Sequence, residues 1–261
     1  MQENAINKLA IITGASTGIG FELASIAAQE GYDIIVVANE DFIHAAAADF
    51  RLHGTTVTAV EADLSISEGG DKLLAHLDGR HLDVLCANAG AGMGGAFLEI
   101  EVNDWRHSID TNVTGTVYLL QQALSGMVRR GEGKILVTGS IVGYIPGSFN
   151  AISNATKAFI DNFTDALRDE LLDYEDVTLT TLLPGATDTE FFARADMLDT
   201  KVGANEHKAD PADVARDGWD AMMKGKDRIT SGLINKLQVA VAGVVPPAIL
   251  AGMHRKLAEP E

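Results

Sequence analysis

Ser153 and Lys157 are four residues apart in a stretch of helical character, so both side chains lie on one helix face. A hydroxyl beside an ammonium group is a candidate pair for acid–base chemistry. An aliphatic hydroxyl ionises far above the value of about 10 for a phenol, so one lysine does not make it a proton acceptor near neutral pH. The pair therefore marks a candidate reaction site with an unusual hydroxyl.

A glycine-rich segment, Thr13-Gly14-Ala15-Ser16-Thr17-Gly18-Ile19-Gly20, follows a predicted strand and precedes a predicted helix. Glycine lets the backbone turn tightly and approach a pyrophosphate, whose charge is met by the amino terminus of the helix. An ordinary glycine-rich turn is the alternative, but the strand–turn–helix placement favours a dinucleotide site. The predicted cofactor contacts are Gly14, Ser16, Thr17, Gly18, Ile19 and Gly20.

The elements that position these motifs alternate between short β-rich runs and stretches of helical length. Strands are predicted at 9–13, 34–38, 56–60, 84–87, 134–138 and 178–183, with an edge strand at 228–231. Helices are predicted at 19–30, 42–53, 68–78, 104–130, 151–174 and 211–224. Strands that are apolar on both faces and separated by helices imply a parallel sheet covered on both sides. We therefore expect a doubly wound, Rossmann-type α/β fold of about seven strands.

Composition limits the classes of protein and partner. A chain of 261 residues with 46% hydrophobic residues can bury one large core, so we expect one dinucleotide-binding and catalytic domain over 1–261. The net charge of −17 argues against nucleic-acid and anionic-membrane partners. The single cysteine, Cys86, excludes a disulfide framework or cysteine metal site. Met1-Gln2-Glu3-Asn4 has no signal-peptide character, and a cytoplasmic location is expected.

Further motifs follow in order, mostly at the ends of predicted strands, where α/β folds bind ligands. They are Asp63-Leu64, Asn88-Ala89-Gly90, Asn112, Ser140 and Pro184-Gly185-Ala186-Thr187-Asp188-Thr189. Together with the TGxxxGIG spacing of the glycine-rich segment, they resemble the motifs of the short-chain dehydrogenase/reductase family over about residues 8–231. Ala87 stands where that family has the first Asn of Asn-Asn-Ala-Gly.

The resemblance implies roles for the cofactor residues. Asp63, with Leu64, would hold the adenine amino group, and Asn88, Ala89 and Gly90 would line the cofactor. The nicotinamide carboxamide would be held by the segment that contains Pro184, Gly185, Thr187 and Thr189.

The resemblance also implies a catalytic set of Asn112, Ser140, Ser153 and Lys157. In the family, the asparagine kinks its helix and holds a water, the serine holds the substrate oxygen, and the lysine binds ribose. The family has tyrosine at the position of Ser153, and that phenol passes the proton. The residue spacing from Ser140 and the continuation Asn154-Ala155-Thr156-Lys157 keep Ser153 in that register.

Serine at position 153 predicts impaired chemistry. Its oxygen falls several ångströms short of the substrate oxygen, and loss of a general acid–base costs about 10²–10⁴ in rate. The serine is either natural or an introduced substitution. A water in the vacated space and the nearby phenol of Tyr144 are alternative routes for the proton.

The second predicted strand ends in Ala38-Asn39-Glu40-Asp41, which bears on the choice of cofactor. A carboxylate at this corner accepts hydrogen bonds from the adenosine ribose and repels a 2′-phosphate. NADP-preferring relatives usually have Arg or Lys there. We therefore favour NAD over NADP, with Glu40 or Asn39 as the ribose contact, and the alternative is that Glu40 and Asp41 cap the next helix.

Three functions are compatible with these motifs. The first is an NAD-dependent short-chain oxidoreductase acting on a neutral or hydrophobic alcohol or ketone. The second is a non-catalytic dinucleotide-binding protein, and the third is a repurposed pocket with isomerase or lyase chemistry. The expected pocket is apolar and is formed by Met93, Gly94, Ile141, Val142, Tyr144, Phe191 and Phe192. Helix packing is the alternative for the two phenylalanines.

The last part of the chain is apolar but interrupted by Pro246-Pro247. Its longest uncharged piece, 239–253, is shorter than the about 20 residues that span a bilayer. We interpret 232–261 as a subunit-contact or pocket-covering segment, without a membrane partner. In the similar family, the two long helices pack against a second subunit, so a homodimer or homotetramer is expected.

Overall fold

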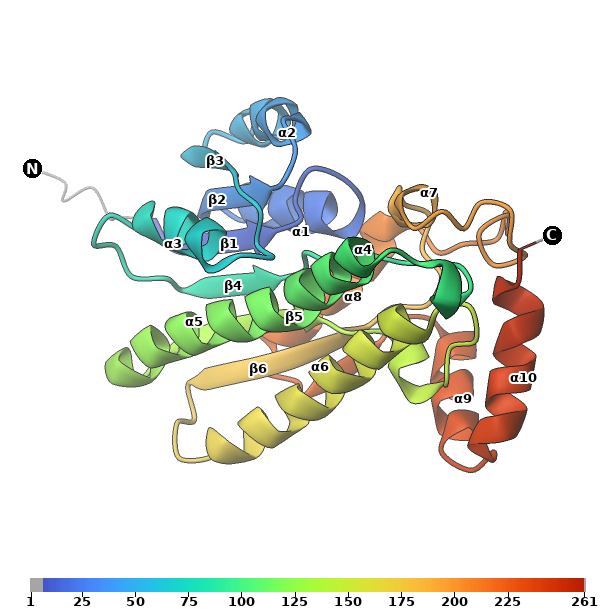
Figure 1. Cartoon of the computed structure of the whole chain (residues 1–261). Helices are drawn as coiled ribbons and strands as arrows, with labels where there is room; N and C mark the ends of the chain where they lie inside the picture. Colours follow the sequence, from blue (N-terminus) through green and yellow to red (C-terminus); the bar gives the residue numbers. More distant parts are fainter. Residues whose placement is uncertain (1–6, 261) are drawn as a thin grey trace, which may run out of the picture.

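A parallel sheet of seven strands forms the centre of the protein in a computed structural model that describes residues 7–260 (Figure 1). The strand order is β3-β2-β1-β4-β5-β6-β7, and each neighbouring pair is parallel. The predicted doubly wound fold is therefore confirmed. The segment Met1-Gln2-Glu3-Asn4, on which the expectation about a signal peptide depends, lies outside the described residues.

The predicted strands are all present, with ends that differ by no more than about one residue. They are β1 (Leu9–Thr13), β2 (Asp33–Ala38), β3 (Val57–Glu61), β4 (Val84–Ala87), β5 (Gly133–Thr138), β6 (Val177–Leu183) and β7 (Arg228–Thr230). Strands β1, β2 and β4 are buried along their whole length, because helices cover both faces of the sheet. Cys86 is a buried core residue of β4.

Helices pack on both sides of the sheet and build two hydrophobic cores. One side carries α1 (Gly18–Gln29), α2 (Phe42–Arg51) and α8 (Pro211–Met223), and the other carries α3 (Ser67–Ala75), α5 (Thr116–Arg130) and α6 (Ala151–Glu170). Helix α8 begins with a side-chain cap, since Asp210 Oδ1 accepts a hydrogen bond from Ala212 N at 2.8 Å and Pro211 opens the helix.

The predicted helix at 104–130 is interrupted in the structure. It consists of α4 (Val102–Ile109), a π-helical turn (Asp110–Gly115) and α5. A π turn inside an α-helix inserts one extra residue per turn, and such turns often occur at functional sites. This turn contains Asn112, one of the predicted catalytic residues.

The segment after β6 and the last part of the chain contain helices that were not predicted. They are α7 (Phe191–Arg194), α9 (Leu233–Ala242) and α10 (Pro247–Ala258). Helices α9 and α10 lie beyond one end of the sheet, and Pro246 precedes α10, which begins at Pro247 (Figure 1). Over residues 7–260, the structure contains no helix of the length and apolar character needed to cross a membrane.

Candidate active site

The predicted site motifs meet at the carboxyl ends of the central strands. The glycine-rich segment follows β1, Asn88 follows β4, Ser140 follows β5 and Pro184 follows β6. Because all strands are parallel, these positions are the carboxyl ends of neighbouring strands, and β1 and β4 are the pair at which the strand order reverses. Ligands in doubly wound folds bind in the crevice at this reversal.

The glycine-rich segment has the backbone that a pyrophosphate requires. Gly14 and Gly18 have positive φ angles of 65° and 58°, which favour glycine. A Cβ atom at Gly20 would lie 2.0 Å from Gly14 O, so no side chain fits there. Helix α1 has no acidic residue in its first turn, and no side chain caps its amino terminus. Its free N–H groups therefore remain for an anion.

Asn88 joins the ends of three strands. Its backbone N–H donates to Thr13 Oγ1 at 2.9 Å, and its Nδ2 donates to Thr13 O at 3.2 Å. Thr138 Oγ1 in turn donates to Asn88 Oδ1 at 3.0 Å. These bonds connect β1, β4 and β5 at the point where the glycine-rich segment starts, and they give the loop after β4 a defined position.

Asn112 holds that same loop from the π-helical turn. Asn112 Oδ1 accepts from Ala91 N at 2.7 Å, while Nδ2 donates to Ala91 O at 2.9 Å and to Thr156 Oγ1 at 3.0 Å. The side chain is buried, with 5% exposed, and its amide is bonded on both sides to protein groups. Its observed contacts position the loop after β4 against α6.

The hydroxyl of Ser153 is bonded to the backbone of a single residue. Ser153 Oγ accepts from Met93 N at 2.8 Å and donates to Met93 O at 3.2 Å. The side chain is buried, with 8% exposed. The donor of this hydroxyl is therefore used to hold the loop after β4, one helical turn from Lys157.

Lys157 lies between the loop after β4 and the end of β5. Its Nζ donates to Thr138 O at 2.7 Å and is 3.8 Å from where a Cβ on Gly90 would lie. Burial lowers the pKa of Lys157, and the carboxylate of Asp161 opposes that shift. The ammonium is therefore directed toward the segment predicted to line the cofactor.

Ser140 and Tyr144 lie at the two ends of a 3-10 turn (Ile141–Tyr144). Ser140 Oγ accepts from Val142 N and donates to Pro184 O, each at 3.3 Å. Tyr144 Oη accepts from Arg228 Nη1 at 3.0 Å, and burial raises the pKa of this phenol. The Tyr144 hydroxyl thus contacts β7.

Glu40 contacts the glycine-rich segment and a distant arginine. Glu40 Oε1 accepts from Ser16 Oγ at 2.6 Å and from Arg194 Nη2 at 2.8 Å. Asp41 precedes α2 but makes no side-chain capping bond, so neither acidic side chain caps that helix through a hydrogen bond. Arg194 was not among the predicted site residues, and no local sequence signal identifies it.

The residues predicted to contact the adenosine make few side-chain hydrogen bonds. Asp63 Oδ1 accepts from Ser65 N at 2.9 Å, which stabilises the turn after β3. Leu64 is buried, and its carbonyl oxygen would lie 2.1 Å from a Cβ on Gly115. Asn39 is exposed.

The segment after β6 covers the glycine-rich segment and the loop after β4. A Cβ on Gly18 would lie 2.8 Å from Thr189 Cγ2, and a Cβ on Gly92 would lie 2.5 Å from the ring of Phe191. Gly94 N donates to Ala195 O at 2.9 Å. Phe192 is buried in a small cluster with Ala195 and Met197, so its side chain serves packing rather than lining a pocket.

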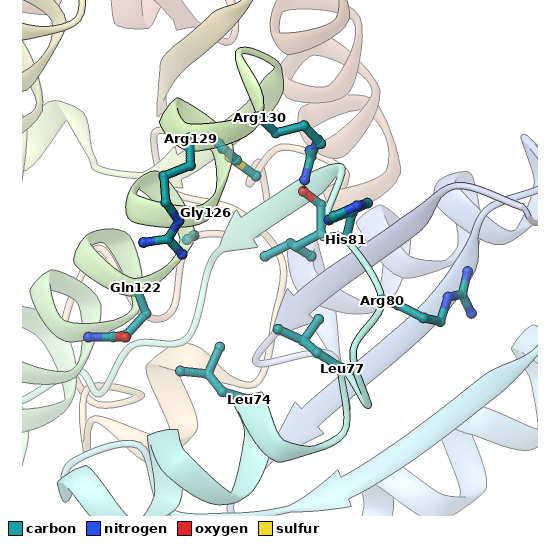
Figure 2. A pocket seen from close by; sticks show the side chains of 11 residues that line it. Leu74, Leu77, Arg80, His81, Gln122, Gly126, Arg129 and Arg130 are labelled. Carbon is teal, nitrogen blue, oxygen red and sulfur yellow. Dashed lines mark hydrogen bonds between the residues drawn. The ribbon is translucent and has the colours of Figure 1, made fainter.

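A cavity of about 430 Å³ lies elsewhere, between α3, α5 and the loop before β4 (Figure 2). Several basic side chains line it, but Arg80 pairs with Asp33 at 2.8 Å, and Arg130 Nη2 donates to Leu82 O at 2.8 Å. These bonds connect the loop to the body of the protein. Because the cavity faces the start of β4, it is separate from the predicted site at the strand ends.

Comparisons with known proteins agree with this geometry. The short chain dehydrogenase family matches residues 8–198. An uncharacterized oxidoreductase of Staphylococcus epidermidis is 31% identical over 197 residues, which are 74% of this chain and 84% of that protein. An uncharacterized oxidoreductase of Staphylococcus aureus is 31% identical over 212 residues, 80% of this chain and 88% of that protein.

Solved structures share the fold. A short-chain dehydrogenase of Sphingobium yanoikuyae in complex with NADPH is 25% identical, with a TM-score of 0.80 over 92% of this chain and 96% of that chain. A short chain dehydrogenase/reductase of Burkholderia phymatum in complex with NAD is 23% identical, with a TM-score of 0.80 over 90% and 92%. The family match, the strand order and the glycine-rich segment lead to one conclusion. The chain belongs to the short-chain dehydrogenase/reductase family and is an NAD(P)-dependent oxidoreductase of that family.

Proposed function

We propose that this oxidoreductase uses NAD to interconvert a neutral or hydrophobic alcohol and its ketone, and that its turnover is slow. The observation that carries the proposal is the pair of hydrogen bonds between Ser153 Oγ and the backbone of Met93. At the position where the family has tyrosine, this chain has a serine, which has a shorter side chain. Its hydroxyl already donates its proton to Met93 O. Ser153 therefore positions the loop after β4 and does not pass a proton.

The residues at the carboxyl edge fit a nicotinamide dinucleotide. The uncapped amino terminus of α1 and the side-chain-free position at Gly20 support a pyrophosphate site. We assign the ribose beside the nicotinamide to Lys157 and the carboxamide to the segment 184–189. When bound, the nicotinamide supplies hydride chemistry; the remaining work of the chain is to hold the substrate oxygen and to move its proton.

Ser140 is the residue that we assign to the substrate oxygen. Its hydroxyl bonds to Pro184 O and Val142 N at 3.3 Å each, which are long bonds that a substrate oxygen can displace. For the proton, we propose a water beside Ser140, charge-stabilised by the ammonium of Lys157. A water without a tuned phenol is a weaker acid–base, and the expected loss is about 10²–10⁴ in rate.

The proposed substrate class depends on the lining beside this site. Met93, Val142 and Phe191 are partly buried or exposed around the loops that frame it, and none of them carries a charge. An apolar lining favours a neutral substrate over a carboxylate or a sugar phosphate. Turnover of NAD(H) with a panel of neutral secondary alcohols and ketones tests this proposal, and a preference for anionic substrates contradicts it.

A non-catalytic dinucleotide-binding function is the second candidate. The engaged hydroxyl of Ser153 favours it, because every cofactor-binding element can act without that hydroxyl. Tight NAD binding without turnover on the whole panel would decide for this candidate.

We also propose that the chain is one catalytic domain in which 232–261 forms a subunit contact. Helix α9 exposes Leu233, Ile234 and Leu237 at 82%, 75% and 66% of their surface. Contiguous exposed apolar side chains of this kind are typical of protein interfaces. A second copy of this chain is the proposed partner, since these exposed apolar side chains lie on a segment continuous with the body of the domain.

A further inference from the structure

Asp161 is a buried acidic residue on the same helix face as the proposed catalytic residues. It follows Lys157 by one turn of α6 and Ser153 by two turns. Its side chain is buried, with 6% exposed. In the described part of the chain, neither Oδ1 nor Oδ2 of Asp161 has a hydrogen-bond partner with good geometry, although the Ser140 N–H is near enough to lower the pKa of this carboxyl. A buried carboxyl in this state is costly, so its presence calls for a physical reason.

The carboxyl group of Asp161 supports the turn that carries Ser140. A Cβ on Gly139 would lie 1.9 Å from Asp161 Oδ1, and a Cβ on Gly143 would lie 2.4 Å from Asp161 Oδ2. Both positions must therefore be glycine for the carboxyl group to fit. The group therefore lies against the two glycines that flank Ser140 and Val142 in this turn.

Lys157 is the cation that the Asp161 carboxylate can act on. Burial raises the pKa of Asp161 to about 7, and the Lys157 ammonium opposes that shift. The Asp161 carboxylate in turn opposes the lowering of the Lys157 pKa by burial. The two groups are not within the 4.0 Å of a direct ion pair in the described residues, so their attraction acts across a buried region of low dielectric constant.

The other charged groups near Asp161 have partners of their own. Arg228, on β7, donates to Asp165 and to Tyr144 Oη. Arg168, on α6, donates to Thr181 Oγ1 at 3.0 Å and pairs with Asp165. Lys157, by contrast, has only the neutral carbonyl of Thr138 as a hydrogen-bond acceptor within the described residues. The charge of Asp161 is thus matched mainly by Lys157.

We propose that Asp161 is a positioning residue of this active site, and that its carboxylate is the counter-ion that keeps the Lys157 amine charged and directed toward the cofactor ribose. This inference rests on the proposed role of Lys157 in cofactor binding. Asp161 touches neither the substrate nor the cofactor in this account and acts only through Lys157.

The test is the pH dependence of NAD binding in Asp161→Asn, an uncharged variant of nearly the same volume. The carboxylate is present above about pH 7 and is protonated below it. At pH 6, the variant should bind NAD as the unmodified chain does. At about pH 9, its affinity should be weaker by about tenfold, because the carboxylate that opposes the lowering of the Lys157 pKa is gone and more of the amine is neutral. Superimposed binding curves from pH 6 to 9 would overturn the proposal.

Two controls separate this proposal from the function on which it rests. Asp165→Asn removes an exposed carboxylate one turn further along α6 and should leave the pH dependence unchanged. Lys157→Met should abolish the pH dependence of NAD binding. If that pH dependence persists in Lys157→Met, Lys157 is not the titrating group. If NAD does not bind to any form, the proposed function fails while Asp161 is still tested by the next measurement.

That measurement uses the unmodified chain and needs no cofactor. Carboxyl ¹³C NMR of Asp161 should show a titration midpoint well above the value of about 3.9 for an ordinary aspartate. The charged Lys157 amine holds this midpoint down in the unmodified chain. The midpoint should therefore rise in Lys157→Met, where the counter-charge is absent. An unchanged midpoint in Lys157→Met would overturn the coupling even where Asp161→Asn does not fold.

Discussion

Arg194 Nη2 donates to Glu40 Oε1 at 2.8 Å, although the two residues are 154 positions apart in the chain. The bond joins α7 to the turn after β2, and Ser16 Oγ shares the same carboxylate oxygen at 2.6 Å. Both side chains are partly exposed, at 47% and 25%, so the ion pair adds only about 0–1 kcal/mol to stability. Its importance is electrostatic, because it partly neutralises the carboxylate at the proposed adenosine ribose contact.

This relationship leads to a prediction about the cofactor. NAD(H) should bind at least about tenfold tighter than NADP(H), a difference of about 1.4 kcal/mol, because Glu40 repels a 2′-phosphate. Arg194→Gln should widen the preference, since Glu40 then carries an unshielded charge, and Glu40→Gln should narrow it. Fluorescence titration of both cofactors measures these affinities. Arg216→Gln, which removes an arginine paired with Glu30 just after α1, is the matched control. Equal affinity for the two cofactors in the unmodified chain would refute the assignment.

A second prediction concerns the hydroxyl at position 153. Ser153→Tyr should raise kcat by about 10²–10⁴ on neutral secondary alcohols or ketones, the usual contribution of a general acid–base. The variant loses both bonds to Met93, so the part of the loop around Met93 must move to admit the ring. NAD affinity should change little, because the glycine-rich segment and Lys157 are untouched.

The outcome of that experiment separates the candidate functions. A tyrosine variant that binds NAD but stays inert across the panel would favour the binding or non-redox function. Ordinary turnover by the serine form would mean that another group passes the proton. Tyr144→Phe then tests the nearest phenol, and we expect less than about a twofold change, because its hydroxyl is bonded to Arg228.

A third prediction concerns Lys157 itself. Lys157→Ala should weaken NAD binding whatever residue stands at position 153, because the proposed contact is between the ammonium and the ribose. A charge-assisted hydrogen bond contributes about 1.5–3 kcal/mol, so the expected loss is about 10- to 100-fold. Isothermal titration calorimetry measures it. Lys134→Ala, at the other end of β5, is the control, and an unchanged affinity in Lys157→Ala would remove this residue from the cofactor site.

A fourth prediction concerns assembly. The unmodified chain should be a dimer or tetramer by light scattering at micromolar concentration. Leu237→Asp should shift it toward the monomer, because it places a charge in the exposed apolar face of α9. Leu52→Asp is the matched control, since Leu52 is 82% exposed on the far side of the fold after α2. A monomeric unmodified chain, or equal effects of both variants, would argue against a subunit contact through α9.

The sequence by itself determined the strands, the order of the motifs and the family. Strands such as β1 and β4 are apolar on both faces, and this pattern requires a sheet covered by helices on both sides. The glycine-rich segment is equally local, since Gly14 and Gly18 need positive φ angles whatever surrounds them. The cap at Asp210 follows from adjacent residues in the same way.

Only the tertiary structure decided what the side chains of the site contact. Three contacts join segments that are separated in the sequence. They are the ion pair of Glu40 with Arg194, the bonds of Ser153 to Met93, and the contact of Asp161 with Gly139 and Gly143. The interruption of the predicted helix at 104–130 is of the same kind, because Asn112 in the π-helical turn is held by Ala91 and Thr156. Local patterns record which face of an element is apolar, but the partner of a buried polar group depends on which elements fold against it.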